Sequence, residues 1–238
     1  MHWIYLSPHL DDVALSAGGL LWEQAHAGDS VQVWTICAGD PTTKHFSPFA
    51  QSLHDRWGIG RDVVAVRRSE DTQSCDLLGA SCRHFFIEDC IYRTSANTGA
   101  FLYPSEEAIF GALHPDDTPV IAQLIRDFTA RILKETQVVC PLTIGGHVDH
   151  QLTRAAAERL GIKLWYYADF PYSLDSPIAN PKYLDAQRFS VSSAGMQAWQ
   201  KSIAAHGSQI SSFWENIEDM RTDIQKHSRQ MEGIFLWH

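Results

Sequence analysis

The 238-residue sequence has few cysteines and no cluster of basic residues, and each shortage excludes some classes of function. The five cysteines are an odd number without a Cys-x-x-Cys pair, so we expect reduced thiols in the core rather than a disulfide framework or a closed zinc site. Lysine and arginine number 19 against 28 aspartate and glutamate residues, a formal net charge of −9. This charge argues against nucleic acid or an anionic membrane surface as the partner.

Long apolar runs and a secretory leader are also lacking. No apolar stretch approaches the ~20 residues that a membrane-spanning helix needs. The first residues have neither a basic segment nor a small-residue cleavage site, so we expect a cytoplasmic protein without membrane contact. No linker, repeat or low-complexity segment divides the chain, and residues 1–238 are therefore expected to form a single domain.

Segments with strand character alternate with helical segments along the chain. The expected strands are residues 2–8, 30–39, 82–90, 137–143 and 163–170, with an edge strand at 188–192. The expected helices are residues 13–27, 120–135, 149–160 and 194–227. The charged stretch 51–79 is expected to be helical with a break near Gly58 and Gly60. This alternation predicts an α/β fold, a Rossmann-like and mainly parallel sheet with helices on both faces.

Two clusters of polar side chains follow the first and fourth expected strands. They are "SPHLDD", with His9, Asp11 and Asp12, and "GGHVDH", with His147, Asp149 and His150. The carboxyl ends of parallel strands meet at one edge of a sheet, so these clusters can lie together. Two histidines and one carboxylate form the ligand set of catalytic zinc sites, and the same set suits Fe(II). A cation would also offset the repulsion between adjacent aspartates, one of which can ligate while the other faces the attacking water.

Each of these residues has a simpler explanation when it is taken alone. Asp11 or Asp12 could be the N-cap of the following helix. The two histidines of the second cluster could be partly exposed residues at a helix start. A run similar to the "HLDD" of the first cluster, "HPDD", stands at 114–117, inside the loop-like segment 91–119, where we expect a turn and helix cap rather than a metal site. The strand-end position of the first copy and its histidine-rich counterpart favour a metal site there.

The sequence resembles the PIG-L/LmbE-like zinc-dependent deacetylases, which remove N-acetyl groups from glucosamine-containing substrates. The resemblance rests on "PHLDD" followed by "GG", on "RRSEDTQSCDLLG" at 67–79, on "HVDH", and on "KSIAAHGSQI" at 201–210, in that order. It departs from the family pattern at Val13, where glutamate is frequent, and at Pro8 and Leu10. A tyrosine found in some relatives is replaced by Gly145, and its role would fall to Tyr166, Tyr167 or Tyr172 or be missing.

The resemblance implies a role for each matching residue. His9, Asp12 and His150 would ligate zinc, Asp11 would be the general base, His147 would stabilise the oxyanion or assist the leaving amine, Asp149 would orient a histidine, and Arg67 would face substrate. An ion-paired helix residue near Glu70 is an equally good explanation of Arg67. Segment 91–119 and the aromatic stretch 165–172 are expected to shape the substrate pocket.

The expected function is zinc-dependent N-deacetylation of a small N-acetylated sugar or glycoconjugate. The sequence does not decide whether the chain forms homo-oligomers. The alternatives are an amidase acting on a thiol conjugate or modified sugar, and a non-catalytic, metal-containing sugar-binding protein. Asp11 discriminates between these classes, because a purely structural metal site has no use for a free carboxylate beside its ligand.

Overall fold

A seven-stranded sheet forms the centre of the computed structural model, which describes residues 1–60, 62–174 and 184–238. The strands are β1 (His2–Ser7), β2 (Ser30–Thr35), β3 (Ser81–His84), β4 (Gln137–Pro141), β5 (Leu164–Tyr167), β6 (Ala186–Phe189) and β7 (Ile234–Trp237). Their order in the sheet is β3-β2-β1-β4-β5-β7-β6. Pairing is parallel from β3 to β5, and β7 is antiparallel to both of its neighbours. The predicted α/β fold with a mainly parallel sheet is confirmed.

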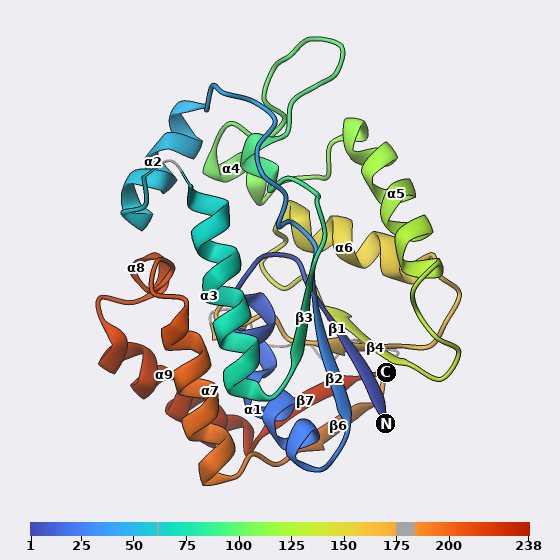
Figure 1. The fold of residues 1–238 in the computed structure, drawn as a ribbon, viewed down its shortest axis with the longest axis vertical. Helices are drawn as coiled ribbons and strands as arrows, with labels where there is room; N and C mark the ends of the chain where they lie inside the picture. Colours follow the sequence, from blue (N-terminus) through green and yellow to red (C-terminus); the bar gives the residue numbers. More distant parts are fainter. Residues whose placement is uncertain (61, 175–183) are drawn as a thin grey trace.

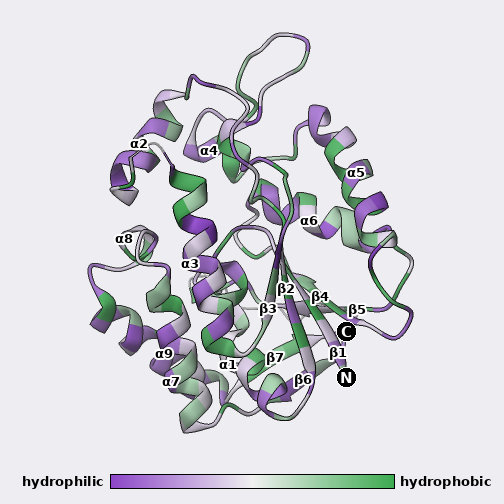
Figure 2. Ribbon diagram, in the orientation of Figure 1, coloured by the Kyte–Doolittle hydropathy of each residue, from purple (hydrophilic) through white to green (hydrophobic). Residues whose placement is uncertain are grey.

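Helices cover both faces of this sheet (Figure 1). They are α1 (Asp12–His26), α2 (Pro48–Trp57), α3 (Val63–Leu78), α4 (Glu106–Ile109), α5 (Thr118–Thr129), α6 (Val148–Glu158), α7 (Ser193–Ala205), α8 (Ile210–Phe213) and α9 (Ile217–Met231). Helices α1, α3 and α7 pack together on one face, and α5 and α6 pack together on the other. In α5 the buried residues Ile121, Leu124 and Phe128 recur at helical spacing, and Figure 2 shows hydrophilic residues on the rest of this helix.

The central strand β1 contributes to two hydrophobic cores. Trp3 and Tyr5 belong to the core shared with α1 and α7, whereas Ile4 and Leu6 belong to the core shared with α5 and α6. Successive side chains of a strand point to opposite faces, so a strand covered on both sides is apolar throughout. This explains why "WIYL" shows no alternation of polar and apolar residues.

Several expected boundaries differ from the structure. The single helix expected at 194–227 is wrong, because α7, α8 and α9 divide that region. Ser208 interrupts it by binding Glu70 through both its backbone N–H, at 2.9 Å, and its hydroxyl, at 2.6 Å. Asn216 then caps α9 by accepting from the N–H groups of its first turn. The expected break in 51–79 is confirmed, since α2 ends at Gly58 with φ of 64°.

Two further differences concern short elements. Segment 91–119 contains α4 and two 3₁₀ turns, Cys90–Tyr92 and Pro115–Asp117, in addition to loop. Strand β7 was not expected, because four residues after a glycine give too little pattern to separate a strand from a tail. The expected edge strand corresponds to β6, shifted toward the N-terminus.

The loops that follow β1, β4 and β5 all leave the sheet at its carboxyl edge, where α2 and α4 also lie (Figure 1). This edge is where open α/β sheets bind ligands. Among the residues described, no helix is both long and apolar enough to cross a membrane.

Candidate active site

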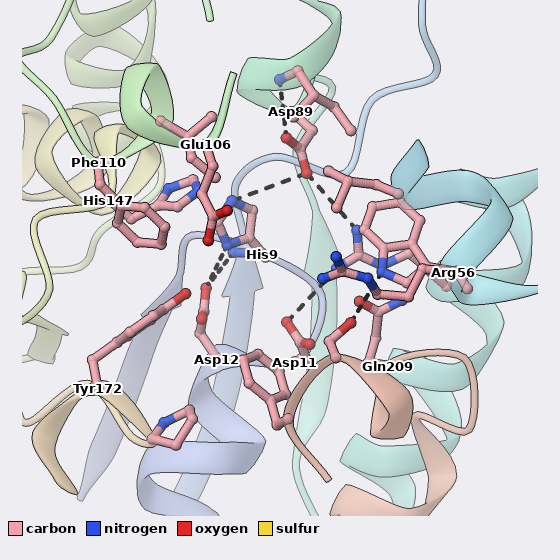
Figure 3. A pocket seen from close by; sticks show the side chains of 18 of the residues that line it. His9, Asp11, Asp12, Arg56, Asp89, Glu106, Phe110, His147, Tyr172 and Gln209 are labelled. Carbon is pink, nitrogen blue, oxygen red and sulfur yellow. Dashed lines mark hydrogen bonds and ion pairs between the residues drawn. The ribbon is translucent and has the colours of Figure 1, made fainter. Parts of the chain in front are cut away.

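One carboxylate oxygen lies between two histidine rings at the carboxyl edge of the sheet, and Figure 3 shows its contact with one of them, His9. Asp12 Oδ2 is 3.1 Å from His9 Nδ1 and 3.3 Å from His150 Nε2, and it accepts the backbone N–H of His9 at 2.7 Å. His147 completes the group, with its ring centroid 4.7 Å from that of His9 and 5.4 Å from that of His150. The predicted clusters from 9–12 and 147–150 therefore meet in space.

The two histidines beside Asp12 are each held from behind by a further carboxylate. His150 Nδ1 is 2.5 Å from Asp169 Oδ1, and His9 Nε2 is 3.0 Å from Asp149 Oδ2. Within the described ranges, the buried Nε2 of His150 has no hydrogen-bond partner. Carboxylate-held imidazoles with their other nitrogen directed at a shared point are typical of metal ligands. The residues present therefore fit a divalent cation.

The electrostatics of this group favour a bound cation. Burial alone would raise the pKa of Asp12, but His150 and His9 hold it well below its usual range. Burial opposes charge on His150, yet Asp12 and Asp169 raise its pKa to about 9. His9 behaves in the same way, because the carboxylates around it raise its pKa well above the usual value despite its burial. Negative groups that attract protons onto two buried imidazoles would also attract a metal ion.

Asp11 occupies the N-cap position of α1 without capping the helix, since its side chain makes no cap hydrogen bond. It faces Arg67 instead, with 3.7 Å between Oδ1 and the guanidinium. Burial raises the pKa of Asp11, and Arg67 opposes that rise. The N-cap explanation of this carboxylate is therefore wrong.

Arg67 lies in the pocket and not beside Glu70, which is bound to Ser208. The guanidinium is 3.8 Å from Asp89 Oδ2 and lies 4.8 Å from the centre of the Trp57 ring. The ion-pair explanation of Arg67 therefore holds in part, with Asp11 and Asp89 as its partners.

His147 has a different role for each of its ring nitrogens. Its Nδ1 accepts the backbone N–H of Asp149 at 3.2 Å and so caps α6. Its Nε2 makes only a long contact, 4.0 Å, with Cys90 Sγ in the described chain. Burial, with His9 nearby, lowers the pKa of His147 well below its usual value. A neutral ring whose Nδ1 accepts must carry its proton on Nε2, where it can be donated to a ligand. The expectation of partly exposed histidines is wrong, since His150 is 1% exposed.

The "HPDD" at 114–117 forms a turn, as predicted, but one of its carboxylates is not a simple cap. His114 Nδ1 accepts the N–H of Asp116 at 3.1 Å, and α5 begins at Thr118. Asp117 makes no side-chain cap and is fully buried, where it forms an ion pair with Arg93 at 2.9 Å. Sequence reasoning did not identify Arg93, because a single arginine in a loop without periodicity indicates neither its contacts nor a function.

Of the three tyrosines considered for the role of the missing family tyrosine, Tyr172 is the one that packs against Gly145. A Cβ added at Gly145, where φ is +86°, would lie 2.9 Å from Cγ of Tyr172, so this aromatic ring requires glycine there. Figure 3 shows the Tyr172 hydroxyl directed toward the centre of the pocket. The hydroxyls of Tyr166 and Tyr167 are directed elsewhere, to Glu158 and to the backbone oxygen of Leu6.

These residues line a cavity of about 490 Å³, which is within the range of small-molecule sites. Its floor is polar, and its walls are largely apolar. The walls include Phe49, Leu53, Trp57, Ile91, Ile109, Phe110, Leu174, Phe213 and Trp214. Segments 91–119 and 165–172 both contribute, as predicted, through residues such as Ile109 and Tyr172. Sequence reasoning missed Asp89 and Asp169, because both were placed inside expected strands, 82–90 and 163–170, whereas β3 and β5 end before them.

A cluster of histidines and carboxylates in a pocket at the carboxyl edge of a parallel sheet defines an α/β protein with a candidate metal site. The family model of the PIG-L GlcNAc-PI de-N-acetylases matches residues 4–160, more than half of the chain. The chain belongs to this family, and the predicted enzyme class, a hydrolase acting on an amide bond, is confirmed by the named deacetylases that it resembles.

The relatives and solved structures that resemble this chain include several named as deacetylases. A 2'-N-acetylparomamine deacetylase of Niallia circulans is 30% identical over 71% of this chain and 67% of its own length. A second, of Streptomyces fradiae, is 31% identical over 71% of this chain, which spans only 57% of that relative. The solved structure of teicoplanin deacetylase Orf2 in its zinc-inhibited form superposes with a TM-score of 0.87, at 29% identity, over 100% of this chain and 97% of that one.

Proposed function

We propose that this chain is a metal-dependent N-deacetylase of an N-acetylated amino sugar, with Zn²⁺ held by His9, Asp12 and His150. The observation that carries the proposal is the shared oxygen, Asp12 Oδ2, within 3.3 Å of a nitrogen of each histidine. Three protein ligands leave a coordination position open for chemistry. Fe²⁺ suits the same donors. Residues 1–238 would form one deacetylase domain.

The neighbouring side chains divide the acid and base chemistry. Bound zinc would polarise the acetyl carbonyl and lower the pKa of the attacking water. Asp11, adjacent in sequence to Asp12 but directed toward Arg67, takes the proton of that water. His147 donates from Nε2 to the carbonyl oxygen as negative charge develops there. Nδ1 of His147 accepts the backbone N–H of Asp149 and therefore cannot take up a proton and pass it on. The departing amine receives its proton from Asp11, which gained it from the attacking water.

Asp149 holds His9 in the orientation that ligation needs. Its Oδ2 accepts from His9 Nε2 at 3.0 Å, which directs the other ring nitrogen, Nδ1, toward Asp12 and the proposed metal position. Asp169 does the same for His150.

Arg67 is proposed to bind a substrate hydroxyl. Its two ion pairs, at 3.7 and 3.8 Å, are longer than hydrogen bonds, and its Nε has no hydrogen-bond partner in the described part of the chain. A guanidinium with free donors beside Trp57, an aromatic side chain, suits a sugar ring that stacks on one face and offers hydroxyls on its edge.

The apolar walls support a substrate with an apolar carrier. The amino sugar would occupy the polar floor, and aromatic side chains such as Phe110 and Trp214 would contact an aglycone. The relatives named for N-acetylparomamine and for teicoplanin support an N-acetylated, sugar-containing substrate.

Acetate release from a panel of substrates tests this function. The panel holds an aryl glycoside of N-acetylglucosamine, free N-acetylglucosamine and an N-acetylated thiol conjugate, each with the zinc-loaded protein. We expect the aryl glycoside to have the highest kcat/KM of the three compounds. We also expect the Asp11→Asn variant to bind metal but to release no acetate from this glycoside. Preference for the thiol conjugate would support the alternative amidase, and no release from any compound would contradict the proposed substrate class.

A further inference from the structure

A buried chain of charged side chains runs from the inserted segment 91–119 to the candidate metal site. Asp117 contacts Arg93 with both oxygens, Oδ1 at 2.9 Å from Nε and Oδ2 at 3.1 Å from a terminal nitrogen. The other terminal nitrogen of Arg93 donates to Asp149 Oδ1 at 2.6 Å. Asp149 Oδ2, in turn, is 3.0 Å from His9 Nε2.

Asp149 depends on this contact because it has no access to water. Its side chain is 0% exposed, and a buried carboxylate without a partner is strongly unfavourable. One oxygen receives Arg93, while the other receives His9 and the backbone N–H of Cys90 at 3.0 Å. Arg93 therefore stabilises the charge that Asp149 needs in order to hold His9.

The shape of the guanidinium matters as well as its charge. Arg93 binds Asp117 along one edge and directs its remaining nitrogen to Asp149 and to the backbone oxygen of Glu88, at 3.0 Å. Tyr103 donates to Asp117 Oδ2 at 2.6 Å and fixes that carboxylate in place. A lysine ammonium is a single point donor and cannot reproduce this fork.

We propose that Arg93 and Asp117 are positioning residues for the metal site. Arg93 fixes Asp149, and Asp149 fixes the tautomer and the ring orientation of His9, so the "HPDD" at 114–117, which binds no metal itself, supports the "HLDD" at 9–12 that does. This inference rests on the proposed metal function of His9. It also gives segment 91–119 a role in metal binding in addition to its place in the pocket wall.

Two conservative variants and one matched control test the proposal. Arg93→Lys keeps the positive charge but loses the fork, and Asp117→Asn keeps the shape but loses the charge. Asp116→Asn is the control, because Asp116 is the neighbouring aspartate, with a side chain 32% exposed. The readouts are the zinc dissociation constant by competition with a chromophoric chelator, the visible spectrum of the cobalt(II)-loaded protein, and the thermal midpoint of the metal-free protein.

We expect both variants to bind zinc roughly 10- to 100-fold more weakly and to show an altered cobalt spectrum, with the control unchanged. The double variant should bind no more weakly than Arg93→Lys alone, because Asp117 acts through Arg93. Folded variants with the wild-type dissociation constant and spectrum, and only a lower thermal midpoint, would overturn the proposal. Wild-type protein that binds no metal would instead overturn the proposed function on which it rests.

Discussion

Replacing His147 should separate two functions that one side chain performs with two different nitrogens. In His147→Ala, loss of the Nδ1 cap on α6 should cost about 1 kcal/mol of unfolding free energy, a fall of roughly 2–4 °C in the thermal midpoint. Loss of the Nε2 donor should lower kcat by roughly 10²- to 10³-fold, or about 2.7–4 kcal/mol of transition-state stabilisation. Metal content should not change, because His147 is not one of the three proposed ligands.

His147→Asn is the matched variant for this experiment. An asparagine oxygen can accept the backbone N–H of Asp149 in place of Nδ1, so the thermal midpoint should return toward that of wild type. Asparagine is too short to reach the position of Nε2, and kcat should stay low. Measurement of kcat, metal content and thermal midpoint on both variants decides the matter. If His147→Asn recovers both stability and turnover, His147 is only a helix cap and the proposed oxyanion role is refuted.

Three further predictions concern the surrounding residues. Asp11→Asn should keep its metal and lose most of its turnover, and unchanged acetate release by the metal-loaded variant would remove Asp11 as the base. Asp169→Asn should weaken zinc binding roughly 10- to 100-fold in a chelator competition, since it releases His150 Nδ1; an unchanged affinity would count against His150 as a ligand. His114→Ala should leave metal content and kcat near wild type, because that ring only caps a surface turn. A large loss of either would mean that the metal site lies at 114–117 and not at 9–12.

Sequence reasoning could place the two main clusters because topology fixes where they meet. His9 and Asp12 follow β1, His150 follows β4, and these strands are parallel neighbours whose carboxyl ends lie at one edge. No detail of side-chain packing was needed for that step. The adjacent aspartates and the spacing of the histidines then indicated a metal site with a further carboxylate beside it.

The supporting residues could not be predicted in the same way. Asp169 follows β5, and Asp89 follows β3, but a single aspartate after a strand is most often a turn residue. Arg93 and Asp117 are 24 residues apart in a segment without periodicity, so only the folded chain brings them together. The division of 194–227 into three helices likewise depends on Glu70, which binds Ser208 from a distant part of the sequence.

The metal-to-protein ratio of wild type and Asp12→Ala, measured by elemental analysis after loading with zinc, tests the proposed site most directly. Wild type should hold about one tightly bound ion per chain, and Asp12→Ala should lose both the ion and acetate release, because it removes the oxygen shared by His9 and His150. Asp12→Ala protein that retains a full complement of zinc and wild-type acetate release would contradict the assignment of this cluster as the catalytic metal site.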